Sequence, residues 1–355
     1  MKKYIDLEDM ANLNCSNILN IIQKNGAVSR KEIIELSGLS WGGMTKIVNK
    51  LLENGYIIEN EKEAASSSRG RTPTLLRINT GKNYIIGFDL NQMGLTAVVM
   101  NLTGEILERF SAPAGFTSRK ELEEKSTKFI SGIFKKYEEN TIIAIGVAMQ
   151  GIVDRRNGNC ERFFFDNKSE IIPIKDILEK NFPVRVFVEH DPDCILFSHM
   201  ERDRKENAVL LRIDRGIGMA VAVAGKIVKG KGIFEIEHNC AIPNGIACGC
   251  GRRGCLVAYT RQCFNEKNDI ITEKTKELLL PLSITLQNLS NLFNSDRIIL
   301  TGALMEHQDV FKDQLSDQLK KLNCETEIEF ASVSDFAVKG AGLIAIKKSI
   351  ASLEI

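Results

Sequence analysis

The stretch Glu235–Leu256, which reads EIEHNCAIPNGIACGCGRRGCL, is the part of the sequence most diagnostic of a particular fold. It places His238 upstream of three clustered cysteines, Cys248, Cys250 and Cys255. One imidazole and three thiolates match a closed tetrahedral zinc site, in which four protein ligands leave no position for a reacting water. The glycines between the cysteines allow the loop to fold tightly enough for the sulfurs to converge. The sequence therefore predicts zinc as a structural cofactor.

Cysteine usage elsewhere favours a metal site over a disulfide framework. The chain has nine cysteines, an odd number, and only those of the loop are clustered. Its first residues, MKKYIDLEDMANLN, place acidic side chains where a signal peptide needs an apolar run, so a cytoplasmic protein is expected. Two alternatives stay open: the loop cysteines are reduced and unliganded, or Cys240 competes as a ligand.

Length and composition indicate a globular protein of more than one domain. The 355 residues exceed what one hydrophobic core usually organises, and 43% hydrophobic with 26% charged residues is close to the globular average. Apolar runs are too short for a membrane span, so no membrane partner is expected. The net charge of +1 means that DNA binding would need a local basic patch on a small domain.

Apolar residues recur at helical spacing between residues 16 and 54, and two polar turns interrupt them. This pattern predicts three short helices. Ser29 and Ser40 stand where N-caps would start the second and third helices, and Glu32 completes a capping box with Ser29. Two short helices joined by a tight turn are typical of a helix-turn-helix.

A predicted hairpin follows these helices. Residues 56–58 and 74–78 read as two strands on either side of the polar loop 61–73, whose sequence is EKEAASSSRGRTP. Three helices followed by a hairpin predict a winged helix-turn-helix domain over residues 1–80.

The third helix is expected to enter the major groove, so the exposed side chains of its first turns must reach bases and phosphates. The spacing of Met44, Ile47, Val48 and Leu51 predicts its buried face. A domain that binds protein, or serves only in dimerisation, is the alternative, and Trp41 could instead pack within its own domain. The residues predicted to contact operator DNA are Ser29, Ser40, Trp41, Gly43, Thr45, Lys46 and Lys50, with Arg69 and Arg71 in the wing.

From residue 82 onward, predicted strands alternate with helices, which indicates an α/β fold. Two lobes are expected, the first over residues 81–190 plus 335–355 and the second, with the zinc loop, over 191–334. The predicted strands are 84–90, 95–102, 141–149, 184–190, 207–213, 218–225 and 297–302, and the main predicted helices are 119–138, 272–294 and 337–352.

Over essentially its whole length the sequence resembles the ROK family of repressors and sugar kinases. The zinc loop is similar to the family signature, a Glu-x-x-His segment followed by CxCGxxGCLE. Further matches are GFD at 87–89, GVAMQGIVD at 146–154, VEHD at 188–191, GIG at 216–218 and AGKIVKG at 224–230. The resemblance implies a two-lobed, actin-like, sugar-kinase-like body, and the N-terminal winged helix marks the repressor branch. A homodimer or homotetramer on operator DNA, with a sugar or sugar-phosphate effector, is expected.

Departures from the kinase members of the family concern the loops that hold ATP phosphates. The Asp-x-Gly-Gly-Thr loop of the kinases reads Asp-Leu-Asn-Gln-Met at 89–93, so its glycines are lost. The kinase Gly-Thr-Gly reads Asp214-Arg215-Gly216, where a carboxylate would repel phosphate and Arg215 could partly offset it. Because phosphoryl transfer depends on positioning and charge stabilisation, we expect no enzyme activity and no catalytic residues.

The family's sugar pocket is retained only in part. The resemblance assigns His190, Asp191, Glu235 and His238 to effector binding, with His190 in place of an asparagine. Val257 stands in place of the CLE glutamate, which should weaken or redirect sugar recognition. A vestigial cleft without a ligand, a regulator switched by a protein partner, and a sugar kinase with an appended DNA-binding domain are the alternatives.

Overall fold

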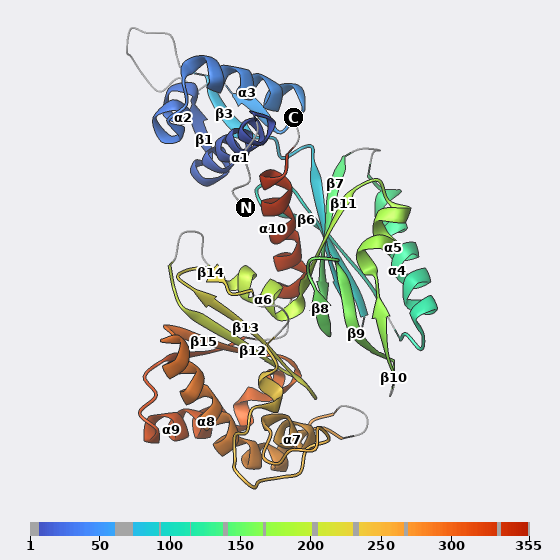
Figure 1. Cartoon of the computed structure of the whole chain (residues 1–355), viewed down its shortest axis with the longest axis vertical. Coiled ribbons are helices and arrows are strands. Elements are labelled where there is room, and N and C mark those ends of the chain that lie inside the picture. The colour runs from blue at the N-terminus through green and yellow to red at the C-terminus, as the bar shows by residue number, and fades with distance from the viewer. Residues whose placement is uncertain are drawn as a thin grey trace. The chain divides into compact units, whose positions relative to one another are not determined.

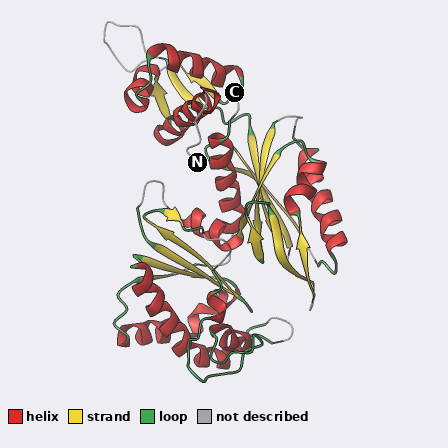
Figure 2. Ribbon diagram, viewed as in Figure 1, coloured by secondary structure: helices red, strands yellow, loops and turns green. Residues whose placement is uncertain are grey.

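The computed structural model describes residues 7–60, 74–91, 94–113, 115–137, 141–165, 168–200, 205–229, 234–265, 269–331 and 335–353. The chain divides into two compact units, and each combines segments that are distant in sequence. The first unit contains Met1–Val147, Phe165–Val188 and Ala341–Ile355, and the second contains Ala148–Phe164 and Glu189–Gly340. Figures 1 and 2 show helices and strands in both units, as expected for an α/β protein. The predicted three-part division of the chain stays a prediction.

The first unit begins with the predicted winged helix. Its elements are α1 (Leu7–Asn25), β1 (Ala27–Ser29), α2 (Arg30–Ser37), α3 (Trp41–Glu53), β2 (Ile57–Asn60) and β3 (Leu75–Ile78), with strand order β1-β3-β2. The capping box is confirmed, because Ser29 Oγ accepts from the Glu32 amide and the Ser29 amide donates to Glu32 Oε2. Sequence analysis missed β1, which has only three residues, and the first turns of α1.

A five-stranded sheet forms the rest of the first unit, in the order β11-β7-β4-β5-β6. Its strands are β4 (Tyr84–Leu90), β5 (Gly94–Met100), β6 (Ile106–Pro113), β7 (Ile142–Met149) and β11 (Arg185–His190). Helices α4 (Arg119–Phe134) and α5 (Ile174–Asn181) cover one face, and α10 (Phe336–Ala351) covers the other (Figure 1). A Cβ on Gly146 would lie 2.1 Å from the Ala341 carbonyl oxygen, so only glycine allows α10 to lie this close to β7.

The winged helix and this sheet share one hydrophobic core. Buried residues of α1 and α3, such as Ile18 and Met44, belong to the same cluster as Leu102 after β5 and Ile346 of α10. Two hydrogen bonds cross the same boundary, from Ser16 Oγ to the Ile350 carbonyl oxygen at 2.5 Å and from Gln23 Nε2 to the Leu102 carbonyl oxygen at 2.6 Å. Helices α1 and α3 of the winged helix are therefore packed onto the α/β part of the first unit.

The second unit contains another five-stranded sheet, in the order β14-β13-β12-β15-β16. Its strands are β12 (Ala208–Ile213), β13 (Ile217–Val223), β14 (Lys226–Ile227), β15 (Arg297–Thr301) and β16 (Glu327–Phe330), and β8 (Ile152–Asp154) pairs with β9 (Asn159–Phe165). Its helices are α6 (Asp191–His199), α7 (Leu256–Thr260), α8 (Thr275–Phe293) and α9 (Lys312–Lys321), with 3-10 turns η1 (Ile236–His238), η2 (Arg261–Cys263), η3 (Thr272–Lys274) and η4 (Ala303–Val310). Strand β10 (Lys168–Ile172) lies in the first unit.

The predicted strands and long helices of the body are all present, but several short elements were not predicted. Strand β6 alternates half-buried and exposed residues, and α6 begins at Asp191-Pro192 with no helical apolar periodicity to announce it. No helix among the described residues is long and apolar enough to cross a membrane.

Candidate functional sites

Helix α3 is fixed in place by its apolar face and by its cap. Met44, Ile47, Val48 and Leu51 are buried, as predicted. Ser40 accepts a hydrogen bond from the Gly43 amide at 3.3 Å and so starts the helix. With one face buried, the opposite face of α3 is left for a partner.

The structure leaves four of the nine predicted DNA-binding residues exposed, at the start and on the outer face of α3. Ser40, Trp41, Gly43 and Lys46 are exposed, whereas Thr45 and Lys50 are half-buried. The Thr45 hydroxyl donates to the Trp41 carbonyl oxygen at 2.8 Å, within the helix. The hydroxyl of half-buried Ser29 is engaged in the capping box of α2, and Arg69 and Arg71 lie outside the described residues.

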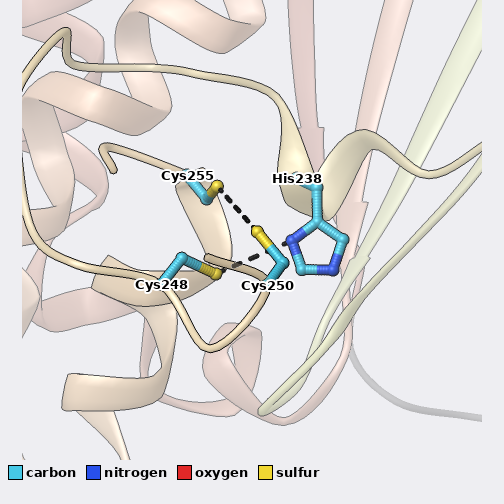
Figure 3. A group of neighbouring side chains, drawn as sticks. All are labelled: His238, Cys248, Cys250 and Cys255. Atoms are coloured by element: carbon cyan, nitrogen blue, oxygen red, sulfur yellow. Dashed lines mark hydrogen bonds between the residues drawn. The ribbon is translucent and has the colours of Figure 1, made fainter. Parts of the chain in front are cut away.

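The predicted metal ligands converge in the second unit. The ligand atoms of His238, Cys248, Cys250 and Cys255 all lie within 4.8 Å of one another (Figure 3). Cys250 Sγ is 3.7 Å from Cys255 Sγ, and Cys248 Sγ is 3.7 Å from His238 Nδ1. Cys240, the alternative ligand, lies outside this group, with its sulfur 3.7 Å from the Arg253 carbonyl oxygen.

This geometry fits a tetrahedral zinc ion. Zinc–sulfur bonds of about 2.3 Å place the corners of a tetrahedron about 3.8 Å apart, close to the Cys250–Cys255 and Cys248–His238 separations of 3.7 Å. The second ring nitrogen of His238 faces Glu237, whose Oε1 is 3.4 Å from His238 Nε2. A carboxylate on the outer nitrogen of a metal-binding histidine orients the ring and raises its basicity. Sequence analysis had not singled out Glu237, although it lies within the EIEH segment.

The pKa values of the cysteine thiols in this group are shifted in opposite directions. A hydrogen bond from Arg252 lowers the pKa of the exposed Cys250 thiol to about 6, which favours the thiolate that a metal needs. Burial raises the pKa of Cys255 to about 12. Val257, which replaces the glutamate of the family signature, is fully buried in a cluster with Cys248 and Cys255. It therefore packs behind the metal loop.

A pocket of about 360 Å³ lies beside the metal loop. It contains two of the four predicted effector-binding residues, Glu235 and His238. Its lining residues are Met219, Phe234, Glu235, Ile236, His238, Asn239 and Arg252. His190 and Asp191 are not among them. Sequence analysis did not predict that Arg252 lines this pocket. Its positive charge within the signature loop was the only feature of the sequence that could have indicated it.

His190 and Asp191 lie in a buried charge network. Arg212 Nη1 donates to Asp191 Oδ2 at 2.6 Å, and Arg212 Nε donates to Asp214 Oδ2 at 2.8 Å. Burial raises the pKa of Asp191 to about 6 and lowers that of His190 to about 4. His190 Nδ1 is buried and has no hydrogen-bond partner among the described residues.

Carboxylates of the protein itself accept hydrogen bonds from two backbone amides at or next to the segments that resemble the kinase phosphate loops. Asp214 Oδ1 accepts from the Ala303 amide at 2.7 Å, at the start of η4. Glu237 Oε2 accepts from the Ile217 amide at 3.4 Å. Arg212 forms an ion pair with Asp214 and so offsets its negative charge. Sequence analysis had considered Arg215 for this role and had not named Arg212.

Comparison with known proteins identifies an N-terminal winged helix and a body of a known family. The profile "Winged helix-turn-helix DNA-binding" matches residues 16–58. The N-terminal part is therefore a winged helix-turn-helix domain of a DNA-binding class. The ROK family profile matches residues 85–262, half of the chain. The protein belongs to the ROK family, with a winged helix-turn-helix followed by an actin-like fold of the sugar-kinase type, and the expected fold and family are confirmed.

Named relatives cover most of the chain. The DNA-binding transcriptional dual regulator NagC of Escherichia coli K12 is 29% identical, and the match covers 84% of this chain and 82% of NagC. The xylose repressor of Bacillus spizizenii is 24% identical over 348 residues, with 86% of each chain covered.

Solved structures share the fold. A ROK family transcriptional regulator, homologous to the E. coli MLC protein, superposes with a TM-score of 0.80 over 96% of this chain and 97% of its own, at 20% identity. A ROK family glucokinase from Streptomyces griseus, solved with glucose and AMPPNP, gives a TM-score of 0.59 over 74% of this chain and 99% of its own, at 18% identity.

Proposed function

We propose that this protein is a transcriptional repressor of carbohydrate-related genes, which binds operator DNA through α3 and the wing. The outer face of α3 is the observation that carries the proposal, because it combines exposed Lys46 with the helix start at Ser40 and Trp41. The names of the relatives, a dual regulator and a xylose repressor, support the same class of function.

Selection of bound duplexes from a random library, followed by footprinting, tests this proposal. We expect a pseudo-palindromic site with half-sites separated by whole helical turns. Lys46→Ala should weaken binding to all sequences and reduce the slope of log affinity against log salt by about one unit. Lys120→Ala, at an exposed lysine of α4, is the matched control and should change neither. Absence of any protected sequence at moderate salt would refute DNA binding.

The body is proposed to act as a sensor without kinase activity. Asp214 and Glu237 accept hydrogen bonds from loop amides that a phosphate would otherwise use. A sugar kinase with an added DNA-binding domain is the second candidate, because the family resemblance aligns Asp191 with the catalytic base of the kinases. Its Oδ2 accepts from Arg212, and this contact favours a structural or ligand-binding role for Asp191 over catalysis.

The effector is proposed to be a sugar or sugar phosphate bound by Glu235 and His238; the family resemblance adds His190 and Asp191, although both are buried and neither lines the pocket described above. A thermal-shift screen with N-acetylglucosamine, xylose, glucose and their phosphates tests this proposal. A ligand that stabilises the protein and releases DNA would support it, and Glu235→Gln should abolish the shift. No shift with any sugar would favour a vestigial cleft or a protein partner.

The metal centre is proposed to hold one zinc ion through His238, Cys248, Cys250 and Cys255, with Glu237 orienting His238. Zinc there would tie the loop to η1 and would hold the Glu235 side of the pocket in place. A homodimer or homotetramer is proposed from the symmetric operators that such repressors bind, and light scattering of the full chain measures it.

A further inference from the structure

Trp41 is an exposed aromatic residue at the start of α3. It is the only tryptophan of the chain, and 61% of its surface is exposed. Tryptophan is enriched at binding interfaces, because its large apolar rings bury much surface on contact and its N–H supplies one polar group. Lys46 and Lys50 lie on the same helix, so a polyanion that also offers an apolar group would match this surface.

The neighbours of Trp41 keep the space around it open. A Cβ on Gly42 would meet nothing within 4 Å, and one on Gly43 would meet only Ser40 Oγ, at 3.3 Å. Two glycines in a helix cost roughly 1 kcal/mol each relative to alanine, so their presence is not explained by helix stability. The polar groups of this turn are engaged locally, Ser40 with the Gly43 amide and Thr45 with the Trp41 carbonyl. Trp41 is thus the large side chain of the first turn that is presented to a partner.

The chemistry of the indole ring selects what it can read. Its rings are apolar, and its one polar group is the Nε1–H donor. In the major groove, the apolar group that distinguishes one base from the others is the C5-methyl of thymine. A tryptophan on a major-groove helix is therefore suited to thymine.

We propose that Trp41 contributes to operator specificity by packing its indole ring against thymine methyl groups in the major groove. This inference rests on the proposed function, because it requires that α3 binds duplex DNA. It goes further by assigning a base and an atom to one side chain.

Tryptophan fluorescence provides the first test, because Trp41 is the sole source of the signal. A selected duplex should shift or quench the emission, and the anisotropy of an end-labelled duplex should measure binding independently. Binding seen by anisotropy with unchanged tryptophan emission would overturn the role of Trp41. Absence of binding by anisotropy to every selected duplex would instead refute the proposed function.

Replacement of single thymines by deoxyuracil provides the second test, because it removes the methyl and keeps the base-pairing groups. We expect about a fourfold loss of affinity for each methyl that Trp41 contacts. Trp41→Ala should weaken binding to the thymine duplex by about tenfold and should abolish the deoxyuracil effect at the same positions. Circular dichroism should show intact folding, because the side chain is mostly exposed.

The outcomes separate thymine reading from simple backbone contact. An equal deoxyuracil penalty in the wild type and in Trp41→Ala would mean that another residue reads the methyl, and it would overturn the proposal. A loss of affinity in Trp41→Ala with no deoxyuracil effect in the wild type would indicate a contact with the sugar-phosphate backbone and would also overturn it.

Discussion

Ser16 of α1 donates a hydrogen bond through its side-chain oxygen to the main-chain carbonyl oxygen of Ile350, 2.5 Å away near the end of α10. Ser16 is buried, so this bond is shielded from water. Helix α10 begins in the second unit and ends in the first, since Phe336–Gly340 belong to the second unit and Ala341 onward to the first. The bond from Ser16 therefore ties α1 to the part of α10 that belongs to the first unit.

Loss of this anchorage should loosen the winged helix. The double variant Ser16→Ala/Gln23→Ala removes the two hydrogen bonds from α1 to Ile350 and Leu102. Each bond contributes about 1 kcal/mol, so we expect a loss of about 2 kcal/mol in the stability of the winged helix. Hydrogen exchange of α1 amides measures it. Ser283→Ala, which loses a bond within α8 only, is the control and should leave α1 exchange unchanged.

Gly42→Ala should separate the needs of folding from those of DNA binding. The added methyl meets nothing within 4 Å, so we expect the variant to be more stable by about 0.5–1 kcal/mol. The same methyl projects from the proposed DNA-facing turn and should reduce operator affinity by about tenfold or more. Urea unfolding and anisotropy measure the two effects. Gly132→Ala in α4, also without a neighbour within 4 Å, should gain stability and keep its affinity.

Sequence patterns predicted the elements that have strong local signals. Two such elements are the capping box of Ser29 with Glu32 and the buried spacing of Met44 and Leu51. Each involves residues only a few positions apart, so it can be recognised from the sequence. The metal loop could be predicted for the same reason, because its three cysteines are close in sequence and His238 belongs to the same signature.

Long-range contacts were not predictable in this way. Arg212 contacts Asp191, which lies 21 positions away, and Asp214 caps an amide 89 positions away. The sequence around Arg212 and Asp214 contains no pattern that predicts these distant partners. Strand β1 was missed for a related reason, since a three-residue segment becomes a strand only because β3 lies beside it.

Opposite pKa shifts at His190 and Asp191 should give opposite dependences of stability on pH. The pKa of His190 is lowered from 6.5 to about 4, so its stability contribution is present above pH 6.5 and is lost as pH falls through about 4. The pKa of Asp191 is raised from 3.8 to about 6, so its contribution is present below pH 3.8 and is lost as pH rises through about 6. Each effect is on the order of 3 kcal/mol.

The two effects largely cancel in the wild type and should appear separately in variants. Asp191→Asn should become more stable as pH rises from 4.5 to 6.5, and His190→Gln should become less stable over the same range. Urea unfolding at several pH values measures both slopes. Parallel slopes in the two variants would contradict the assignment of opposite shifts.

Cys250→Ser should remove the metal, because a closed tetrahedral site that loses one thiolate loses much of its affinity. We expect elemental analysis to find about one zinc per wild-type chain and almost none in the variant, together with a lower midpoint of thermal unfolding. Cys240→Ser is the matched control, since Cys240 lies in the same loop region but outside the ligand group, and it should keep its zinc. Equal zinc content in the two variants would contradict the ligand set.

Asp214 should keep the body from binding nucleotide phosphates, because its carboxylate already accepts the Ala303 amide and is held by Arg212. Wild-type protein with magnesium-ATP and a panel of hexoses, pentoses and amino sugars should form no phosphorylated sugar. Asp214→Ser frees the Ala303 amide and removes the negative charge, so we expect a gain in ATP binding, measured by calorimetry at low salt. Asp317→Ser on α9 also removes one carboxylate, at an exposed position outside these loops, and should show no such gain. Wild-type turnover on the order of 1–1000 per second, the range of working enzymes, would overturn the sensor assignment in favour of a kinase.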